Sequence, residues 1–293
     1  MREDTFVSHR SVLFTVAYEM LGSAADAEDV VQETWLRWAD MADDARGEVN
    51  DPRAYLVRIV TRLALNRLRT RARRREDYVG EWLPEPLLTA PDVTEDLELA
   101  ESISIAMLTV LETLGPIERA VFVLREVFDM PFNEIAAAVG KTPAAVRQIA
   151  HRAREHVAAR RPRMQVDPAE QQRVVERFLA ALRTGDAQRL VEVLAPDVVF
   201  VSDGGGIAQA FPRPIEGSDR VARLLAGLPR FAPQASVRTI LLNGAPALRI
   251  DTEGEHGTTA ISLQIADGRI ARIYAMRNPH KLARLDEPAV LSR

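Results

Sequence analysis

The sequence predicts a multidomain chain: two all-α units, the second with a helix-turn-helix, followed by an α+β unit. Three observations support this prediction. Apolar residues recur at helical spacing in two stretches before Arg163, and the second stretch contains a turn between two helices. After Pro168 the pattern changes to short runs of β-forming residues separated by turn residues. The length of 293 residues suffices for two or three domains, each with its own core.

The first stretch predicts a helix over about 5–21 that ends at Gly22, and a second helix over about 25–41. The apolar positions of the second helix share one face. Its opposite face carries an acidic stripe beside an apolar residue, formed by Asp26, Asp29, Glu33 and Leu36. Such a stripe is suited to docking on a basic partner helix, and a solvated helix face is the alternative.

An Arg-rich helix is predicted after a loop over Asp43–Asn50; Asp51 and Pro52 open it, and it runs to about Arg75. One face of this helix carries Arg58, Arg62, Arg69 and Arg73, and Asn66 stands beside this row. A row of Arg on one face is suited to a phosphate backbone, and the amide of Asn66 can bond a base edge. The alternative is that Arg near the end of a helix only complements the helix dipole.

A Pro-rich acidic linker is predicted over 79–99, extended at first and helical again from about Asp92. Glu76–Ala100 holds eight acids and no base, whereas Thr61–Arg75 holds seven Arg and no acid. Trp82 stands in the stiff segment W-L-P-E-P at 82–86. A large aromatic in such a segment can anchor on a neighbouring domain, and a casual hydrophobic contact is the alternative.

The helix-turn-helix lies within Ile117–Val157. Phe132–Val139 has helical periodicity, Gly140 follows as a stop, and Thr142 with Pro143 begins the next helix as N-cap and first residue. The outward face of that helix carries Arg147, Gln148, His151 and Arg152. Arg and Gln make paired hydrogen bonds to base edges in the major groove. The alternative is an ordinary helical pair with a solvated basic face.

The part after Pro168 predicts an amphipathic helix, a Gly185-Asp186 turn, a short helix to Leu194 and a further helix over 218–228. Strands are predicted over 198–201, 237–242, 247–251, 260–266 and 270–276. Asn243-Gly244 and Asp267-Gly268 are predicted at hairpin turns. Two or three helices over a curved antiparallel sheet make an α+β cone with an apolar interior.

Composition adds limits on location and partners. The chain has no Cys, which excludes disulfides and thiolate metal sites and favours a reducing compartment. The first residues show no signal-peptide pattern, and no apolar run is long enough to cross a bilayer, so a cytoplasmic location is predicted. The net charge of −4 argues weakly against free nucleic-acid binding. Because basic and acidic residues are segregated, we expect binding to depend on a partner or a conformational change.

Several segments carry a family resemblance. Residues 26–38 (DAEDVVQETWLRW), 51–75 (DPRAYLVRIVTRLALNRLRTRARRR) and 117–157 together resemble the two conserved domains of extracytoplasmic-function sigma factors, which are bacterial transcription initiation subunits. The C-terminal part resembles the SnoaL-like fold, related to polyketide cyclases and ketosteroid isomerases. Three further motifs are WLPEP at 82–86, DGGG at 203–206 and NPHKL at 278–282. With them, the chain resembles the SigJ-type subfamily, which carries such a C-terminal extension.

The resemblance covers nearly the whole chain and implies its division. It implies sigma region 2 at 1–78, the linker at 79–99, sigma region 4 at 100–163 and a cone-shaped SnoaL-like regulatory domain at 167–285. Arg62 departs from the pattern, since many members have Asn there, so the details of strand opening do not carry over. Nothing in the chain matches the additional DNA-binding domains of housekeeping sigma factors, which fits a two-domain promoter reader.

The resemblance also implies partners. The core of RNA polymerase would bind through the β′ clamp helices and the β flap, and promoter DNA would bind both as duplex and melted. The clamp helices would receive Asp26, Asp29, Gln32, Glu33 and Leu36. The −10 element would be contacted and opened by Arg58, Arg62, Asn66, Arg69 and Arg73, while the 43–50 loop holds a flipped-out base, a step that costs a few kcal/mol of unstacking. The −35 element would be read by Thr142, Arg147, Gln148, His151 and Arg152. No metal, cofactor or membrane is implied.

In this subfamily the fused domain is expected to regulate in cis, because a tether gives it a high effective concentration. The interdomain contacts are expected at Trp82, Pro84, Asp203, Gly204, Gly205, Gly206, Asn278, Pro279, Lys281 and Leu282. A small-molecule ligand of the C-terminal domain is a further candidate partner.

Two other functions stay open. The C-terminal cone can be an active enzyme of the cyclase or isomerase type, with acid and base groups among Asp203, Asp251, His256 and His280. Both His stand in polar segments, which favours solvated side chains. The chain can also be a helix-turn-helix repressor that binds DNA alone; failure to bind core polymerase would favour it.

Overall fold

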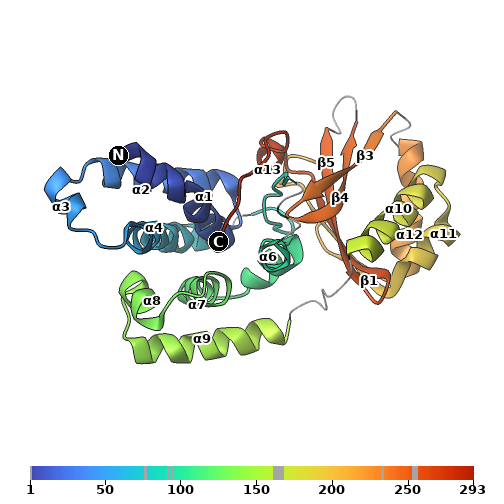
Figure 1. The fold of residues 1–293 in the computed structure, drawn as a ribbon. Helices are drawn as coiled ribbons and strands as arrows, with labels where there is room; N and C mark the ends of the chain where they lie inside the picture. Colours follow the sequence, from blue (N-terminus) through green and yellow to red (C-terminus); the bar gives the residue numbers. More distant parts are fainter. Residues whose placement is uncertain are drawn as a thin grey trace.

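The computed structural model describes residues 2–75, 78–90, 93, 96–160, 168–231, 234–252 and 257–293. Two helical units lie side by side, and a sheet covered by helices lies next to them (Figure 1). They are the first helical unit (2–75), the second helical unit (96–160) and the C-terminal unit (168–293), and the linker segment (78–90) runs between them. Among the described helices, none is both long and apolar enough to cross a membrane.

The first helical unit consists of α1 (Arg2–Leu21), α2 (Ala24–Ala39), the short α3 (Asp43–Gly47) and α4 (Pro52–Arg75). Gly22 ends α1 in the left-handed conformation (φ 61°), and the Ser23 hydroxyl caps α2 by accepting from the Asp26 amide. Apolar side chains of α1, α2 and α4 pack together around the fully buried Trp38. The predicted loop over 43–50 is wrong in part, because it contains α3.

The second helical unit consists of α5 (Leu97–Ser102), α6 (Ile105–Leu111), α7 (Pro116–Phe122), the π-helical turn η2 (Val123–Val127), α8 (Phe132–Val139) and α9 (Pro143–Ala158). Gly140 adopts the left-handed conformation (φ 68°) after α8, as the turn requires. The Thr142 hydroxyl accepts from the Ala145 amide at 3.2 Å and so caps α9. The predicted helix-turn-helix is confirmed.

The two helical units share one apolar core. Helix α4 packs against α7 and α8, and buried residues of both units form a single cluster. Burial of continuous apolar surface favours this closed arrangement, because separating the units would return that surface to water.

The C-terminal unit consists of α10 (Pro168–Thr184), α11 (Ala187–Val193), β1 (Leu194–Asp203), β2 (Ile215–Glu216), α12 (Ser218–Phe231), β3 (Ser236–Leu242), β4 (Ala245–Asp251), β5 (Thr258–Ala266), β6 (Arg269–Met276) and α13 (Pro279–Leu282). The strand order is β2-β1-β6-β5-β4-β3. The predicted strands are found, and both hairpin turns have two successive residues with positive φ. The expectation of a wholly antiparallel sheet is wrong, because β1 and β6 are parallel. Helix α12 lies on the long crossover between them, which a parallel pair requires.

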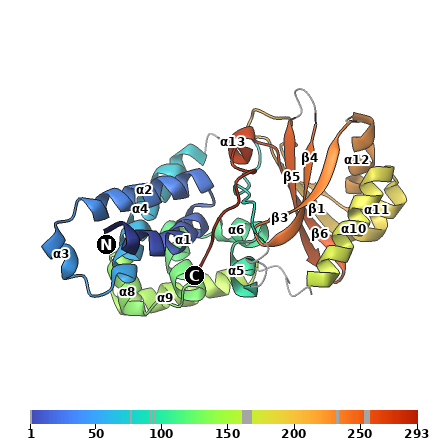
Figure 2. The ribbon, with the colours of Figure 1, turned by 45° about the horizontal axis from the view of Figure 1, so that its top comes forward.

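The sheet has two apolar faces. Alternate residues such as Phe200 and Leu248 pack under α10, α11 and α12. The opposite residues, such as Val201 and Ala247, pack toward the helical units against Leu83 and Ile105. We call this second side the outer face. Figure 2 shows the resulting layers, with the helical units, the sheet and the helices α10–α12 in succession.

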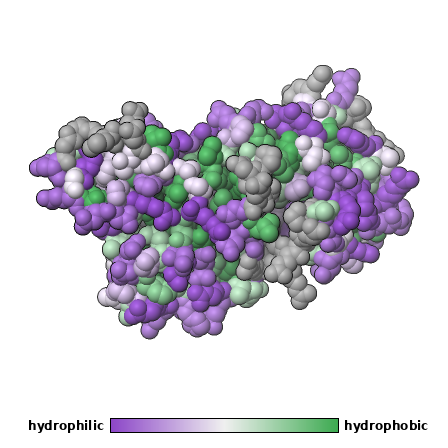
Figure 3. Space-filling model, in the orientation of Figure 1, coloured by the Kyte–Doolittle hydropathy of each residue, from purple (hydrophilic) through white to green (hydrophobic). Residues whose placement is uncertain are grey.

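The linker segment is packed between the helical units and the outer face. Leu83 and Leu87 are 1% and 5% exposed, and Leu88 makes a β-bridge to Leu242. In Figure 3 hydrophobic residues show mainly in the middle of the molecule, between largely hydrophilic ends. The predicted tether is therefore extended but not free, because its apolar residues complete the interface between the units.

After α13 the chain returns to the first helical unit as a C-terminal strap (286–293), and the C label of Figure 1 lies beside α1. The Ser292 amide donates to the Thr15 hydroxyl at 3.1 Å, and Leu291 joins the core shared by the helical units. The Arg293 guanidinium pairs with Asp96 at 2.9 Å. The C-terminal unit thus contacts both helical units.

Candidate nucleic-acid interface and interdomain contacts

The acidic stripe of α2 is partly neutralised within the chain. Arg67 of α4 pairs with Asp26 at 3.2 Å and with Asp29 at 2.5 Å. Glu33 pairs with Arg37 one turn along α2 at 2.8 Å, and both side chains are about half exposed. Leu36 is 53% exposed. The stripe is a surface of paired carboxylates beside an apolar side chain, so a partner has to compete with these pairs.

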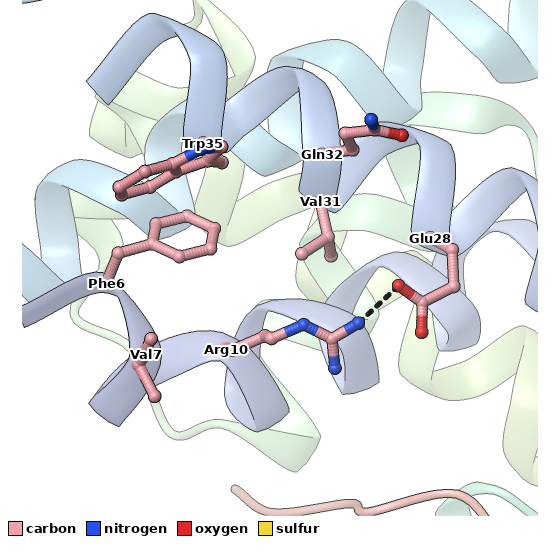
Figure 4. Close-up of a pocket in the computed structure, with 7 residues that line it drawn as sticks. All are labelled: Phe6, Val7, Arg10, Glu28, Val31, Gln32 and Trp35. Carbon is pink, nitrogen blue, oxygen red and sulfur yellow. Dashed lines mark hydrogen bonds and ion pairs between the residues drawn. The ribbon is translucent and has the colours of Figure 1, made fainter. Parts of the chain in front are cut away.

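Gln32, the remaining residue of this predicted set, lines a pocket of about 430 Å³ between α1 and α2. The rings of Phe6 and Trp35 lie 5.1 Å apart on one side, and Arg10 pairs with Glu28 at 2.6 Å on the other (Figure 4). A pocket with both apolar and polar lining residues therefore lies next to the stripe.

The Arg face of α4 is partly engaged with the second helical unit. Arg62 donates to the carbonyl oxygens of Ala137 (2.8 Å) and Ala138 (3.4 Å) near the end of α8. Arg58 lies over the ring of Tyr55 in its own helix at 5.1 Å. Asn66 and Arg69 are exposed. The side chain of Arg73 lies outside the described residues. The closed arrangement thus occupies part of the face predicted to contact DNA.

We expect the variant Arg62→Ala to favour separation of the two helical units, because the hydrogen bonds to α8 are lost. A loss of about 1 kcal/mol, discounted for exposure, would raise the open population roughly fivefold. The open population can be measured by energy transfer between two fluorophores, one on a Cys introduced in α3 and one on a Cys introduced at the end of α9. The chain has no Cys of its own, so both labels are specific.

Arg58→Ala is the matched control, since Arg58 shares the face but stacks within α4. Equal fluorescence changes in the two variants would contradict a specific role of Arg62.

Helix α9 presents its predicted reading face to solvent. The residues Arg147, Gln148, His151 and Arg152 are all exposed. The guanidinium of Arg147 lies 6.0 Å from the centre of the Phe132 ring, which orients it from α8. Thr142 is exposed and caps the helix by accepting from the Ala145 amide of the first turn. This face is free in the closed arrangement, in contrast to α4.

The interdomain contact is centred on the buried carboxylate of Asp203, at the end of β1. Lys281 of α13 pairs with it at 2.7 Å, and the side chains are 4% and 0% exposed. Asp203 also accepts from the Tyr78 hydroxyl (2.5 Å), the Leu83 amide (2.9 Å) and the Gly205 amide (3.0 Å). The linker segment is therefore joined to the C-terminal unit by charge-assisted hydrogen bonds.

An aromatic cage surrounds the Lys281 ammonium. Its nitrogen lies 3.2 Å from the centre of the Trp82 ring and 5.0 Å from that of Tyr78, and it donates to the Leu83 carbonyl at 2.5 Å. Burial of a cation is tolerated here because a carboxylate, a carbonyl and two ring faces replace its water. Trp82 is thus an anchor, as the sequence suggested as one alternative.

The glycine turn after Asp203 fits closely against the same contact. Gly205 has φ 62°, and a side chain on it would collide with the amide of Asn278. A side chain on Gly204 would meet the carbonyl of Ala208, and one on Gly206 would meet Val79. Glycine is required at this approach, because a side chain at position 204 or 205 would overlap with atoms of Ala208 or Asn278.

The structure brings most predicted interdomain residues together. Asn278 donates to the Tyr78 hydroxyl at 3.1 Å, and Leu282 is buried on the outer face. Pro84 is buried beside Gly22, whereas Pro279 is the exposed first residue of α13. The sequence reasoning missed Tyr78, Tyr18, Glu85 and Asn243, which also join the units. For Glu85, its position between Pro84 and Pro86 was the sequence feature that could have indicated an interdomain role.

Of the candidate acid and base groups for an enzyme, the three that the structure describes do not converge in the cone. Asp203 and Asp251 alternate with the residues under the helices and so lie on the outer face. Asp251 pairs with Arg249 at 2.8 Å, and His280 is exposed in α13. His256 lies outside the described residues. The interior under the helices is lined by apolar side chains instead.

Comparisons with known proteins agree with this organisation. Family models match Sigma-70 region 2 over residues 5–74, Sigma-70 region 4 over 104–157 and a SnoaL-like domain over 175–273. A relative, the ECF RNA polymerase sigma factor SigJ of Mycobacterium tuberculosis, is 39% identical over 96% of this chain and 93% of its own length. A probable ECF RNA polymerase sigma factor, SigI of the same species, is 31% identical over 94% of this chain and 92% of its own.

The fold agrees as well. The crystal structure of Mycobacterium tuberculosis SigJ superposes with a TM-score of 0.76 at 36% identity, covering 95% of this chain and 97% of that one. The two proteins share the order of their units, the helix-turn-helix and the fused sheet domain. The chain therefore belongs to the extracytoplasmic-function (ECF) family of RNA polymerase sigma factors, in the SigJ-type group with a C-terminal SnoaL-like domain.

Proposed function

We propose that the chain directs promoter-specific initiation by RNA polymerase and that its C-terminal unit controls this activity in cis. The observation that carries the regulatory part is the burial of the linker segment between the helical units and the outer face. Because Asp203 and Lys281 hold the linker, movement of the C-terminal unit alters the distance between α4 and α9. Those two helices have to reach sites on one promoter together.

The proposed roles on DNA follow from the exposed groups. Helix α9 reads the −35 element in the major groove, where Arg147 and Gln148 can make paired hydrogen bonds to bases. Helix α4 contacts the −10 element through Arg58, Asn66 and Arg69, and through Arg62 once α8 moves away. The closed arrangement supports these roles, since the α9 face is exposed in it whereas Arg62 of the α4 face is bonded to α8.

The proposed polymerase surface is the acidic stripe of α2 with the neighbouring pocket. The β′ clamp helices would replace Arg67 and Arg37 as partners of the carboxylates, and Leu36 would give an apolar contact. The β flap is proposed as the second polymerase contact, at the second helical unit. We also propose that the protein acts in the cytoplasm, because bacterial RNA polymerase transcribes DNA in that compartment.

The test of the docking surface is capture of core RNA polymerase by the full chain. We expect Glu33→Lys combined with Leu36→Lys to lower the affinity at least roughly tenfold, because opposite charge is replaced by like charge at an interface. Binding is measured by anisotropy and activity by run-off transcription.

Glu192→Lys, an exposed charge reversal on α11, is the control and should bind core as the parent does. Equal affinity of all three proteins would contradict the docking surface. A parent chain that never binds core but still binds duplex DNA would support a repressor.

A small-molecule ligand of the C-terminal unit would have to be apolar. The interior between the sheet and α10–α12 is lined by side chains such as Phe178, Leu190 and Ile273. Such a lining offers dispersion contacts and few polar partners.

A further inference from the structure

Asn243, at the tip of the β3–β4 hairpin, contacts three parts of the chain at once. Its backbone amide and its side-chain oxygen bond to the backbone of Leu87 in the linker, both at 2.9 Å. Its side-chain nitrogen donates to the Tyr18 hydroxyl of α1 (2.7 Å) and to the carbonyl of Ile103 after α5 (2.8 Å). The residue is 1% exposed, so every polar atom of its amide is satisfied inside the protein.

Tyr18 connects Asn243 to a second residue of the linker. Its hydroxyl donates to the Glu85 carbonyl at 2.6 Å. The side chain is fully buried, and burial raises the pKa of Tyr18 above its usual value, so the hydroxyl keeps its proton and remains a donor. The phenol is therefore a fixed link between Asn243 and Glu85.

Glu85 in turn caps helix α2. Its carboxylate accepts from the Ser23 hydroxyl (2.8 Å), the Ala24 amide (2.6 Å) and the Ala25 amide (3.1 Å). The first amides of a helix have no partner within the helix, and a negative charge there is favourable to the helix dipole. The linker residue thus supplies the acceptor for the first two amides of α2, whereas the Ser23 hydroxyl accepts from the Asp26 amide.

We propose that Asn243 is a positioning residue that acts through Tyr18 and Glu85 on the N-terminal cap of α2. The hairpin tip of the C-terminal unit is thereby coupled to the helix that carries the acidic stripe. The functional meaning of this relay rests on the proposed docking of α2 on polymerase. The relay itself does not rest on that docking, because its hydrogen bonds are present in the free protein.

Hydrogen exchange of single amides, followed by NMR on the full chain, tests the relay directly. The amides of Ala24 and Ala25 are bonded to Glu85, so their protection reports its position. The Thr34 amide in the middle of α2 is the internal reference. Glu85→Gln first establishes how far exchange at the two amides rises when the cap is weakened.

We expect Asn243→Gly and Tyr18→Phe each to raise exchange at Ala24 and Ala25 about fivefold relative to Thr34, the change that loss of a typical cap produces. Glycine tolerates the positive φ of 52° at position 243, so the turn itself is kept. Tyr18→Phe removes only the hydroxyl oxygen. If Asn243→Gly does not fold, amide exchange in Tyr18→Phe alone tests the relay.

Thr89→Val is the matched control, because the Thr89 hydroxyl accepts from the Gly244 amide of the same turn at 3.0 Å but does not touch Tyr18. It should lower stability while leaving the exchange ratio unchanged. An unchanged ratio in Tyr18→Phe, or an equal rise in Thr89→Val, would overturn the relay.

Affinity for core polymerase separates the relay from the docking proposal. We expect Asn243→Gly and Glu85→Gln to change the affinity by the same factor, and the double variant to add nothing further, as residues of one network do. Additive effects would overturn the relay even where the double variant Glu33→Lys with Leu36→Lys confirms docking. Exchange effects, without any effect of the Glu33→Lys and Leu36→Lys double variant on affinity for core polymerase, would support the relay and overturn the docking.

Discussion

Replacing Lys281 by methionine is expected to destabilise the protein by about 3 kcal/mol, because it leaves the carboxylate of Asp203 buried without a cation. Asp203 is 0% exposed, and its remaining donors are Tyr78, Leu83 and Gly205. These three hydrogen bonds retain part of the stabilisation, which places the cost at the lower end of the usual range. Chemical denaturation of the full chain measures it.

The double variant Lys281→Met with Asp203→Asn should recover most of this loss, since neutral groups of similar shape replace the whole pair. Arg189→Met is the control, because its pair with Asp186 is on the surface of the same unit and contributes about 0–1 kcal/mol. A single variant as stable as the parent would show that the pair is not held away from water. Run-off transcription should change in the same order as stability if the contact controls activity.

The second large effect concerns Glu19, which is fully buried in α1. Its carboxylate accepts from the Ser102 hydroxyl at 2.7 Å, and burial raises its pKa to about 8, although Ser102 and the nearby Arg119 lower it. The unfolded value is close to 4.5. The folded state therefore holds this proton more tightly than the unfolded state does. Its contribution to stability is fully present below about pH 4.5 and is lost as the pH rises toward 8.

We expect Glu19→Gln to remove this loss and to make the protein more stable than the parent near pH 8, by roughly 3–5 kcal/mol as an upper figure. Below about pH 4.5 the two proteins should differ little, because Glu19 is then protonated in both states. Denaturation midpoints over this pH interval measure the difference. The control is Glu192→Gln, at an exposed position. Parallel curves for Glu19→Gln and the parent would contradict the assignment.

Local features were predictable because their causes are local. The stop at Gly140, the cap at Thr142 and the turns at Asn243 and Asp267 follow from backbone preferences that neighbouring residues do not override. The interdomain motifs could be located from the resemblance, but not their contacts. Tyr78 gave no signal, since one aromatic residue in an acidic segment has no periodicity to interpret.

Other expectations failed where partners are distant in sequence. The parallel pairing of β1 with β6 depends on the crossover through α12, which alternation within a strand does not reveal. The enzyme alternative needs Asp203 inside the cone, but its position in β1 directs it to the outer face, where it meets Lys281 among the predicted interdomain residues. The contact of Arg62 with DNA stays a prediction, and its hydrogen bond to α8 in the closed protein is a further contact that the sequence did not indicate.

The sequence by itself determined the long helices, the longer strands, the helix-turn-helix and the order of the units, since propensity, caps and apolar periodicity act over a few residues. The tertiary structure alone decided that the linker is buried, that Lys281 meets Asp203 between two aromatic rings, and that Asn243 reaches Tyr18. These contacts join residues up to 225 positions apart. They form because apolar faces from separate units exclude water together, and the polar groups caught between those faces have to find one another.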